Sequence, residues 1–459
     1  MSARHVIVLG AGPAGLAAAI AALDAGARVT LLDEGERLGG QFWRHHEPIT
    51  DARLQHGWGT FERLRSALAG AIGEGRAVLL QRAAVWRIEP EQLRVHALVG
   101  APDAPGRRRA TVSADAIVLA TGAHDRALPL PGWTLPGVTT AGAAQALAKR
   151  DGVTIGRRTL VAGAGPFLLP VAQSLTVAGG GVVEVLEASR VPRLAGGWAA
   201  RPWELLGAAG KALELAGYAG SLLRHRVPYR TGSGVIRILG ERGVEAAVVA
   251  RLDRDWRPIP GTEREVACDS VALGHGFVPR IDAAMQAGCA LTTAPPGSPR
   301  FVVADSGQRT TVDGVFAAGE ITGIGGADAA LAEGALAGRA AAGAAEASLV
   351  AHRRRRDRTD AFARRLQAAH GIRDGWQSWL DDDTLVCRCE SVDAATITRA
   401  AGTASRALRL ATRAGLGACQ GRTCGASVEA ICGERLGLDA RPVLAPMRIG
   451  ELAAVSDGS

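Results

Sequence analysis

The chain has 459 residues, of which 47% are hydrophobic and 21% charged, and this composition indicates a soluble globular protein of two to four domains. The net charge of +8 is carried almost entirely by arginines, because Lys149 and Lys211 are the only lysines. The arginines are spread along the chain and only 4% of the residues are aromatic, so the composition argues against nucleic-acid binding.

An uncharged run, "VIVLGAGPAGLAAAIAAL", occupies residues 6–23. Its length would suit a membrane span or a signal peptide. Gly10, Gly12, Pro13 and Gly15 interrupt the run and favour a strand, a turn and a helix instead. We therefore expect a cytoplasmic protein without a membrane span, with a peripheral position at the inner membrane surface left open.

The N-terminal pattern predicts a strand over residues 4–9, a glycine turn, a helix to about Gly26 and a second strand. In "GAGPAG" the first glycine allows a tight turn, the second lets a pyrophosphate approach, and the third lets the helix pack closely. Asp33 ends the second strand, where a carboxylate can accept hydrogen bonds from ribose hydroxyls, and Glu34 is the adjacent alternative. Taken alone, this motif is a weak signal.

Three later stretches, "GGQ", "ATG" and "DGVFAAGE", follow in the order of the FAD-binding elements that two-dinucleotide-domain flavoproteins contain, and they resemble those elements. No cysteine precedes Cys268, which argues against a redox dithiol beside the flavin. His45 and His46 lie near the expected flavin loop, either as packing residues or in an active role. The expected FAD contacts are Gly10, Gly12, Pro13, Ala14, Gly15, Asp33, Glu34, Gly40, Gln41, Ala120, Thr121, Gly122, Gly319 and Glu320.

A second strand, glycine turn and helix is predicted over residues 157–180, "RRTLVAGAGPFLLPVAQSLTVAGG". Leu168 stands in place of the third glycine and is expected to hold the helix off the strand, and Pro170 lacks an N–H group. Glu187 would suit the ribose of NAD and would repel the extra phosphate of NADP. Bound NAD and a vestigial or differently used pocket both stay open, and the residues favour the second.

Four of the 7 cysteines form two close pairs, C-x-C and C-x4-C, separated by 29 residues. Four soft ligands suit zinc or an iron–sulfur cluster, and the absence of C-x-x-C spacing favours the cluster. We expect [2Fe–2S], with [4Fe–4S] and zinc as alternatives, and short helices between the pairs. Cys432 could replace one ligand, whereas Cys268 and Cys289 are expected to be buried apolar residues. The expected ligands are Cys387, Cys389, Cys419 and Cys424.

The sequence predicts a charged helix containing "RRRR", whose arginines form a solvated face, and then a "WLDDDT" loop. The tail "RPVLAPMRIGELA" is long enough to fold back over another domain. The predicted organisation is a FAD-binding domain in two parts (1–125 and 295–345), an inserted second dinucleotide-binding-like domain (126–294), a charged linker (346–384), an iron–sulfur domain (385–437) and a tail (438–459).

The motifs "GAGPAG", "DEGERLGGQFWR", "ATGAHDRALPLPGWTLPGV", "GAGPFLLPVAQ", "GHGFVPR", "FAAGEITGIGGADAALAEG" and "VCRCE…TRAGLGACQGRTCG" together resemble one family over essentially the whole chain. This family is the large α subunit of heteromeric amine dehydrogenases, which includes opine dehydrogenases (oxidases), hydrogen cyanide synthase and D-hydroxyproline and related proline dehydrogenases. The resemblance implies an α/β, doubly wound, glutathione-reductase-like flavoprotein. It further implies a small α-helical C-terminal domain like that of bacterioferritin-associated ferredoxin. A leucine in place of the third glycine of the second motif is usual in the family.

The resemblance also implies a division of labour. A flavoprotein of the amino-acid-oxidase type, present as a separate β subunit, would oxidise the C–N bond, and a small γ subunit would carry another cluster. The present chain would pass electrons through its cluster and FAD to a quinone or another acceptor. A stand-alone NAD(P)H-dependent flavin and iron–sulfur reductase is the main alternative, and an iron–sulfur sensing module is the non-enzymatic one.

Overall fold

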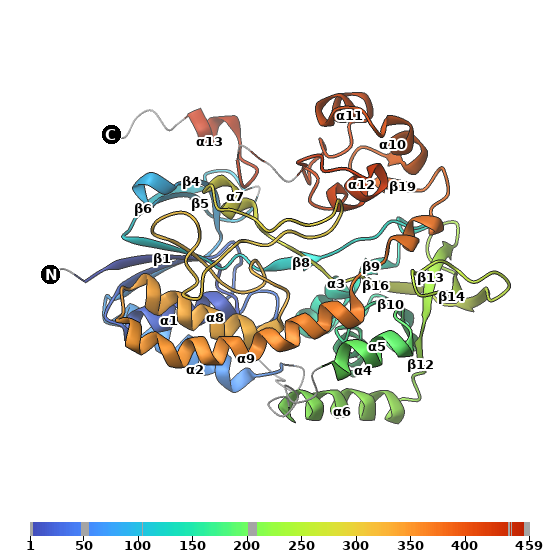
Figure 1. Cartoon of the computed structure of the whole chain (residues 1–459), viewed down its shortest axis with the longest axis horizontal. Coiled ribbons are helices and arrows are strands. Elements are labelled where there is room, and N and C mark those ends of the chain that lie inside the picture. Colours follow the sequence, from blue (N-terminus) through green and yellow to red (C-terminus); the bar gives the residue numbers. More distant parts are fainter. Residues whose placement is uncertain are drawn as a thin grey trace.

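The computed structural model describes residues 3–46, 55–102, 104–200, 209–438, 441 and 443–453. Two parallel five-stranded sheets dominate it, and each forms the centre of one module (Figure 1). The first module is built on the sheet β18-β7-β1-β2-β3, and the second on the sheet β12-β11-β10-β16-β9. The sequence predicted the strand, glycine turn and helix with which each module begins, and both predictions are confirmed.

The first sheet separates two layers of the first module. Its strands are β1 (His5–Leu9), β2 (Arg28–Leu32), β3 (Ala77–Leu80), β7 (Ala116–Leu119) and β18 (Val315–Ala317). Alternate side chains of these strands point to opposite faces, so both faces are apolar. The helices on one face are α1 (Pro13–Asp24), α2 (Trp58–Gly73) and α8 (Gly326–Ala341). The other face meets an antiparallel sheet of β4 (Ala83–Glu89), β5 (Arg94–Val99) and β6 (Arg108–Ser113), with η1 (Pro90–Gln92) between β4 and β5 and α7 (Asp282–Gln286) beside them.

The second module repeats this three-layer plan. Its parallel strands are β9 (Val138–Thr140), β10 (Arg158–Gly163), β11 (Gly181–Glu187), β12 (Tyr229–Thr231) and β16 (Ser270–Gly274). One face packs on the helical layer of α3 (Ala141–Ala146), η2 (Leu147–Asp151), α4 (Leu168–Val177) and α6 (Ala209–Arg224). The other packs on the antiparallel sheet of β13 (Ser233–Leu239), β14 (Ala246–Arg251) and β15 (Arg264–Ala267).

Two short antiparallel strands, β8 (Ala123–Asp125) and β17 (Phe277–Pro279), connect the modules. The predicted charged helix is α9 (Glu346–His370), which runs along α8 and reaches α5 (Val191–Ala199) of the second module (Figure 1). After it, η4 (Asp374–Trp379) buries two tryptophans in the core of the second module. The charged segment is therefore joined to both modules by packed side chains.

The four paired cysteines belong to residues 385–438, which we call the cysteine unit. It has its own small core and contains β19 (Leu385–Cys387), β20 (Val392–Asp393), α10 (Ala394–Ala400), α11 (Ser405–Thr412) and α12 (Gly425–Cys432). Two short helices, α10 and α11, lie between the cysteine pairs, as the sequence predicted. Cys268 and Cys289 are buried, which agrees with their predicted apolar role.

The C-terminal tail returns to the first module, which confirms the sequence prediction. The amide of Leu444 donates to the carbonyl of Trp86 at 3.1 Å. In α13 (Ile449–Ala453), Glu451 forms a well-shielded ion pair with Arg107 at 2.6 Å. Among the helices of the described residues, none is both long enough and apolar enough to cross a bilayer.

Candidate functional site

A cavity of about 2540 Å³ opens at the carboxyl end of the first parallel sheet, where α1 and α8 begin. This volume exceeds the roughly 300–1,000 Å³ typical of small-molecule pockets, so the cavity suits an extended ligand such as a dinucleotide. Ligands of open parallel sheets bind at this edge, and two helix N-termini there favour a phosphate group.

The glycine turn after β1 leaves no room for side chains. Gly10 has a φ of +104°, and a Cβ atom on it would lie 2.3 Å from the carbonyl oxygen of Ala120. A Cβ atom on Gly15 would lie 1.7 Å from the carbonyl oxygen of Gly10. These close approaches bring the first turn of α1 onto the strand, and Gly12 and Pro13 line the cavity at that point.

Asp33 ties the end of β2 to this turn. Its carboxylate accepts hydrogen bonds from the backbone N–H groups of Ala11 and Gly35, the second at 2.6 Å. Burial raises the pKa of Asp33 above its ordinary value, although both amides favour the charged form. Glu34 also lines the cavity and pairs with Arg280 at 3.0 Å.

Most of the predicted FAD contacts meet in this cavity. Two predicted residues do not line it, and both act through close packing: Gly15 against Gly10, and Gly319, whose added Cβ would lie 2.8 Å from that of Ala14. The predicted residues that line the cavity are Gly10, Gly12, Pro13, Ala14, Asp33, Glu34, Gly40, Gln41, Ala120, Thr121, Gly122 and Glu320. Their contact with FAD stays a prediction.

Two carboxyl groups lie close to the loop between β18 and α8: the half-buried Glu320 belongs to this loop, and the buried Glu333 stands in the middle of α8. Glu320 accepts a hydrogen bond from the N–H group of Gly326 at 2.8 Å, and burial raises its pKa to about 7. Glu333 accepts from the N–H group of Gly319 at 2.7 Å and from the hydroxyl of Thr322, and burial also raises its pKa to about 7. Both therefore carry little charge below neutral pH, which limits the repulsion between them and an anionic ligand.

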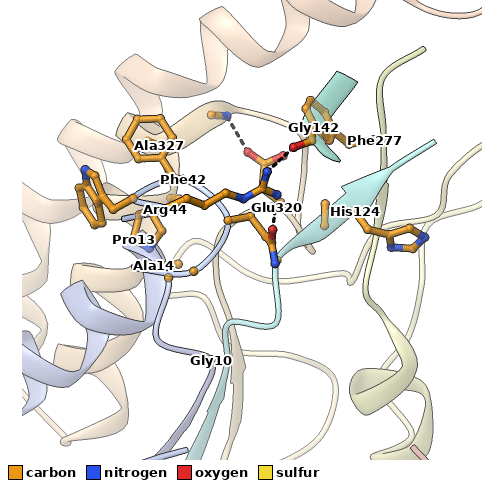
Figure 2. Close-up of a pocket in the computed structure, with 18 of the residues that line it drawn as sticks. Gly10, Pro13, Ala14, Phe42, Arg44, His124, Gly142, Phe277, Glu320 and Ala327 are labelled. Carbon is orange, nitrogen blue, oxygen red and sulfur yellow. Dashed lines mark hydrogen bonds between the residues drawn. The ribbon is translucent and has the colours of Figure 1, made fainter. Parts of the chain in front are cut away.

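Two cations line the cavity where the modules face each other, Arg44 from the first module and Lys149 from η2 of the second, and sequence reasoning did not single them out as site residues. Figure 2 shows Arg44 reaching across the cavity to the carbonyl of Gly142 at the start of α3. Lys149 donates to the carbonyl of Phe42 at 3.1 Å, and burial together with Arg44 lowers its pKa to about 8. The scarcity of lysine was the one sequence signal that could have drawn attention to Lys149.

The two adjacent histidines have different surroundings. His45 is buried, lines the cavity and forms a hydrogen bond with the carbonyl of Trp43 at 2.8 Å. His46 is exposed and forms a hydrogen bond with the carbonyl of Arg150. These contacts agree with a packing role for both histidines.

The second module differs from the first at the corresponding turn. Helix α1 begins at Pro13, three residues after Gly10, whereas α4 begins at Leu168, five residues after Gly163. Leu168 is buried and packs directly on Gly274 of β16. The two are so close that a Cβ atom on this glycine would lie 2.9 Å from the leucine Cδ2 atom. The later start of α4 is how the fold accommodates the leucine that replaces the third glycine.

The structure brings the four paired cysteines together. The thiol of Cys424 donates to the sulfurs of Cys387 and Cys419, which lowers the pKa of Cys387 to about 6 and that of Cys419 to about 4. Cys389 in turn contacts Cys419. Backbone N–H groups of Gly415 and Glu390 also point to Cys387.

Across the described ranges, no group of three or more histidine, cysteine or carboxylate side chains has the geometry of a metal site. The thiols form a row of pairwise contacts, and their role as ligands stays a prediction.

The loop between Cys419 and Cys424 forms part of the cavity wall. Arg422 lines the cavity and lies 3.5 Å from the carboxylate of Asp282, which also pairs with Arg441. Arg441 donates to the carbonyl of Gln420 at 3.0 Å, and Arg422 to that of Leu444 at 2.7 Å. No sequence pattern connects these residues, because they lie far apart along the chain.

Comparison with known proteins agrees with this geometry. Residues 4–334 match the pyridine nucleotide-disulphide oxidoreductase family. One of the opine oxidase subunits of Rhizobium meliloti (strain 1021) is 33% identical over an alignment of 487 residues that covers 99% of both chains. The HcnB subunit of hydrogen cyanide synthase from Pseudomonas aeruginosa is 32% identical over 453 residues, covering 92% of this chain and 91% of that one. The crystal structure of L-proline dehydrogenase from P. horikoshii shares the fold, with a TM-score of 0.66 at 20% identity over 98% of this chain and 79% of that one.

The two doubly wound modules, the glycine turn and the cavity define an FAD-dependent oxidoreductase of the two-dinucleotide-domain class. The chain belongs to the pyridine nucleotide-disulphide oxidoreductase family, and within it is similar to the opine oxidase and hydrogen cyanide synthase subunits named above. The resemblance predicted from the motifs is confirmed.

Proposed function

We propose that this chain is the electron-transferring subunit of a heteromeric FAD and iron–sulfur dehydrogenase. The complex would oxidise the C–N bond of an amino acid or an opine-type secondary amine, with the oxidation itself on a partner flavoprotein subunit. The names of its relatives support this proposal, since the similar chains of opine oxidase and hydrogen cyanide synthase are both subunits of larger enzymes.

One observation carries the proposal: the loop that holds Cys419 and Cys424 is also a wall of the dinucleotide cavity. Arg422, inside this loop, faces the cavity and is held there by Asp282 and the carbonyl of Leu444. Two redox centres exchange electrons efficiently only when they are close, so a cysteine loop in this place suits electron transfer.

The cavity fits FAD in its shape and its backbone. Gly12 and Gly40 approach so closely that a Cβ atom on Gly40 would lie 2.8 Å from the Cα atom of Gly12. The first turn of α1 would hold the pyrophosphate, and Asp33 would hold the adenosine ribose. When bound, FAD supplies an acceptor that takes electrons in pairs and releases them singly.

The four thiols of Cys387, Cys389, Cys419 and Cys424 are the donor set that an iron–sulfur cluster requires. Backbone N–H groups from Gly415, Glu390 and Thr423 point to these sulfurs, as expected around thiolates that bind iron. A [2Fe–2S] cluster bound there supplies a carrier of single electrons.

Partner subunits complete the proposed complex. They are a flavoprotein of the amino-acid-oxidase type, which would oxidise the amine, and a small iron–sulfur subunit. A quinone or another acceptor would take up the electrons.

Metal analysis of the purified complex tests the cluster. We expect about two iron atoms and two sulfide ions per chain, with a rhombic EPR signal after reduction. Cys419→Ser should remove most of the iron, whereas Cys432→Ser, the matched control, should keep it. A chain that holds zinc and no iron would contradict the proposal.

Dye-reduction assays test the division of labour. The chain alone, loaded with FAD, should show no turnover with proline, hydroxyproline, opines, sarcosine or glycine. Addition of the co-purifying flavoprotein subunit should give turnover with at least one of them. Oxidation of an amine by the chain alone would refute the assigned role.

A further inference from the structure

Glu187 in the second module is the counterpart of Asp33 in the first. Each lies at the end of the second strand of its module and accepts backbone hydrogen bonds from its glycine turn. Glu187 accepts from the N–H groups of Gly165 at 2.8 Å and Ser189 at 2.9 Å. However, Asp33 lines an open cavity, whereas Glu187 is completely buried.

His370, the last residue of α9, occupies the remaining side of this carboxylate. Its Nδ1 atom lies 3.1 Å from the Oε2 atom of Glu187. The Nε1–H group of Trp198 donates to the Nε2 atom of His370, also at 3.1 Å. Because Nε2 accepts, the ring proton is on Nδ1 and is donated to Glu187. A ribose diol on Glu187 would have to displace this imidazole.

The end of α9 is fixed to α5 by close packing and by hydrogen bonds. A Cβ atom on Gly197 would lie 2.6 Å from the backbone nitrogen of Ala369, so the two helices touch through their backbones. Arg193 donates to the carbonyls of Ala368 at 3.1 Å and Gly371 at 2.9 Å. The histidine is therefore held in place by the fold and does not reach Glu187 as a mobile side chain.

We infer that His370, supported by Trp198, determines cofactor specificity by occupying the ribose position on Glu187 in the second module, so that the chain takes no electrons from NADH. The late start of α4 at Leu168 acts in the same direction, because the first helical N–H groups are moved away from the turn that would hold a pyrophosphate. This inference goes beyond the proposed function and does not depend on the cysteine unit.

The test measures NADH binding to the full-length chain loaded with FAD. The variants are H370A and W198A/H370A, which remove the ring and its support, and His352→Ala on the same helix is the matched control. We expect the wild type and H352A to bind NADH with a dissociation constant above about 1 mM, and W198A/H370A to bind at least about tenfold more tightly. NADPH should gain less than NADH, because Glu187 would repel its extra phosphate.

Two results would overturn the inference. The first is saturable binding of NADH to the wild type below about 100 µM, which needs no variant and holds even if a variant fails to fold. The second is a W198A/H370A variant with wild-type circular dichroism and FAD content that binds NADH no better than the wild type. Neither result changes the outcome of the iron analysis, so the cluster that the proposed function requires is tested independently of this inference.

Discussion

The imidazole of His124 and the backbone carbonyl of Arg422 are joined by a hydrogen bond of 3.2 Å. Because a carbonyl only accepts, the ring proton is on the Nε2 atom of His124. Burial lowers the pKa of His124, so the ring is neutral at physiological pH. His124 belongs to β8, the strand that connects the two modules, and it lines the cavity. The cysteine loop is thus attached to the connecting strand as well as to Asp282.

Replacement of Asp282 by asparagine should loosen the cysteine unit. The carboxylate pairs with both Arg422 and Arg441, and the side chain of Arg441 is only 6% exposed. Removal of the negative charge beside a buried guanidinium is costly, so we expect D282N to lower the free energy of unfolding by about 1–3 kcal/mol. Thermal unfolding followed by tryptophan fluorescence measures this. Glu346→Gln removes an exposed ion pair with Arg353 and should change stability by less than about 0.5 kcal/mol; equal effects of both variants would contradict the prediction.

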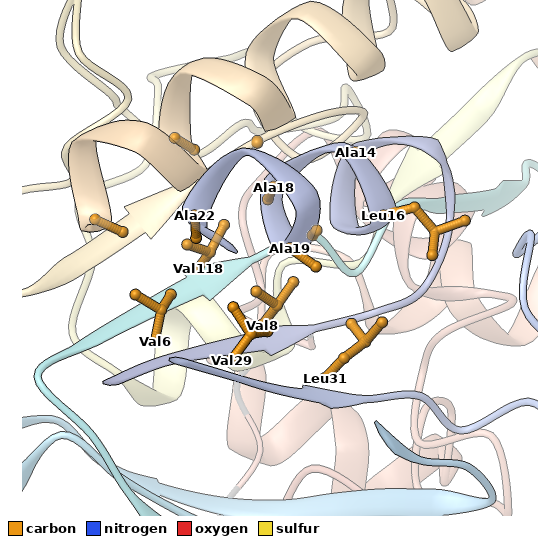
Figure 3. Packing of buried hydrophobic residues seen from close by; sticks show 14 of the residues in the cluster. Val6, Val8, Ala14, Leu16, Ala18, Ala19, Ala22, Val29, Leu31 and Val118 are labelled. Atoms are coloured by element: carbon orange, nitrogen blue, oxygen red, sulfur yellow. The ribbon is translucent and has the colours of Figure 1, made fainter. Parts of the chain in front are cut away.

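Two glycine-to-alanine variants should have opposite effects on stability. Figure 3 shows the apolar strand residues, such as Val6 and Val8, beneath α1. On its other side α1 meets α8, where a Cβ atom on Gly338 would lie 2.1 Å from the carbonyl oxygen of Ala18. G338A should therefore destabilise the protein by about 1–3 kcal/mol. Gly70 in the exposed part of α2 has open space around it, so G70A should stabilise by about 0.5–1 kcal/mol in urea unfolding. A stabilising G338A would show that α1 and α8 are not in backbone contact.

Glu320 makes the stability of the FAD-free protein depend on pH. Its pKa rises from the ordinary 4.5 to about 7 on folding, so the folded state binds more protons than the unfolded state between these values. The stability that Glu320 contributes is therefore complete below pH 4.5 and is lost as the pH rises through 7. The decline between pH 5 and pH 8 should be smaller in Glu320→Gln than in the wild type by at least about 1 kcal/mol. Urea unfolding at both pH values measures the free energy of unfolding. If it declined as much in E320Q as in the wild type, the prediction would be wrong.

Lys149 should contribute to the affinity for anionic FAD in a manner that depends on pH. Its pKa of about 8 means that the ammonium group is charged at pH 7 and largely neutral at pH 9. K149M should weaken FAD binding roughly fivefold at pH 7, as expected for about 1 kcal/mol of electrostatic attraction. Between pH 7 and pH 9 the variant should lose less affinity than the wild type. Fluorescence titration of the FAD-free protein with FAD measures both effects. Arg76→Met removes an exposed cation paired with Glu74 and serves as the control, which should bind FAD as the wild type does.

Local sequence patterns were enough to predict the features that residues close together in the chain form among themselves. The glycine spacing around Gly10 and Gly163 located both strand, turn and helix starts, because sterically crowded turns admit only certain residues. Short apolar runs beside the glycine turns identified the first strands of both modules, and the spacing of the cysteines identified a candidate ligand set. The motif order also identified the family, as the relatives now confirm.

The tertiary structure alone decided which distant residues meet. His370 reaches Glu187 across 183 positions of sequence, and His124 reaches Arg422 across 298. Such contacts depend on how whole helices and sheets pack, and a single histidine or arginine carries no periodic signal of its distant partner. Leu168 already favoured a vestigial or differently used second pocket, but the imidazole on Glu187 and the cysteine loop in the cavity wall were beyond sequence reasoning.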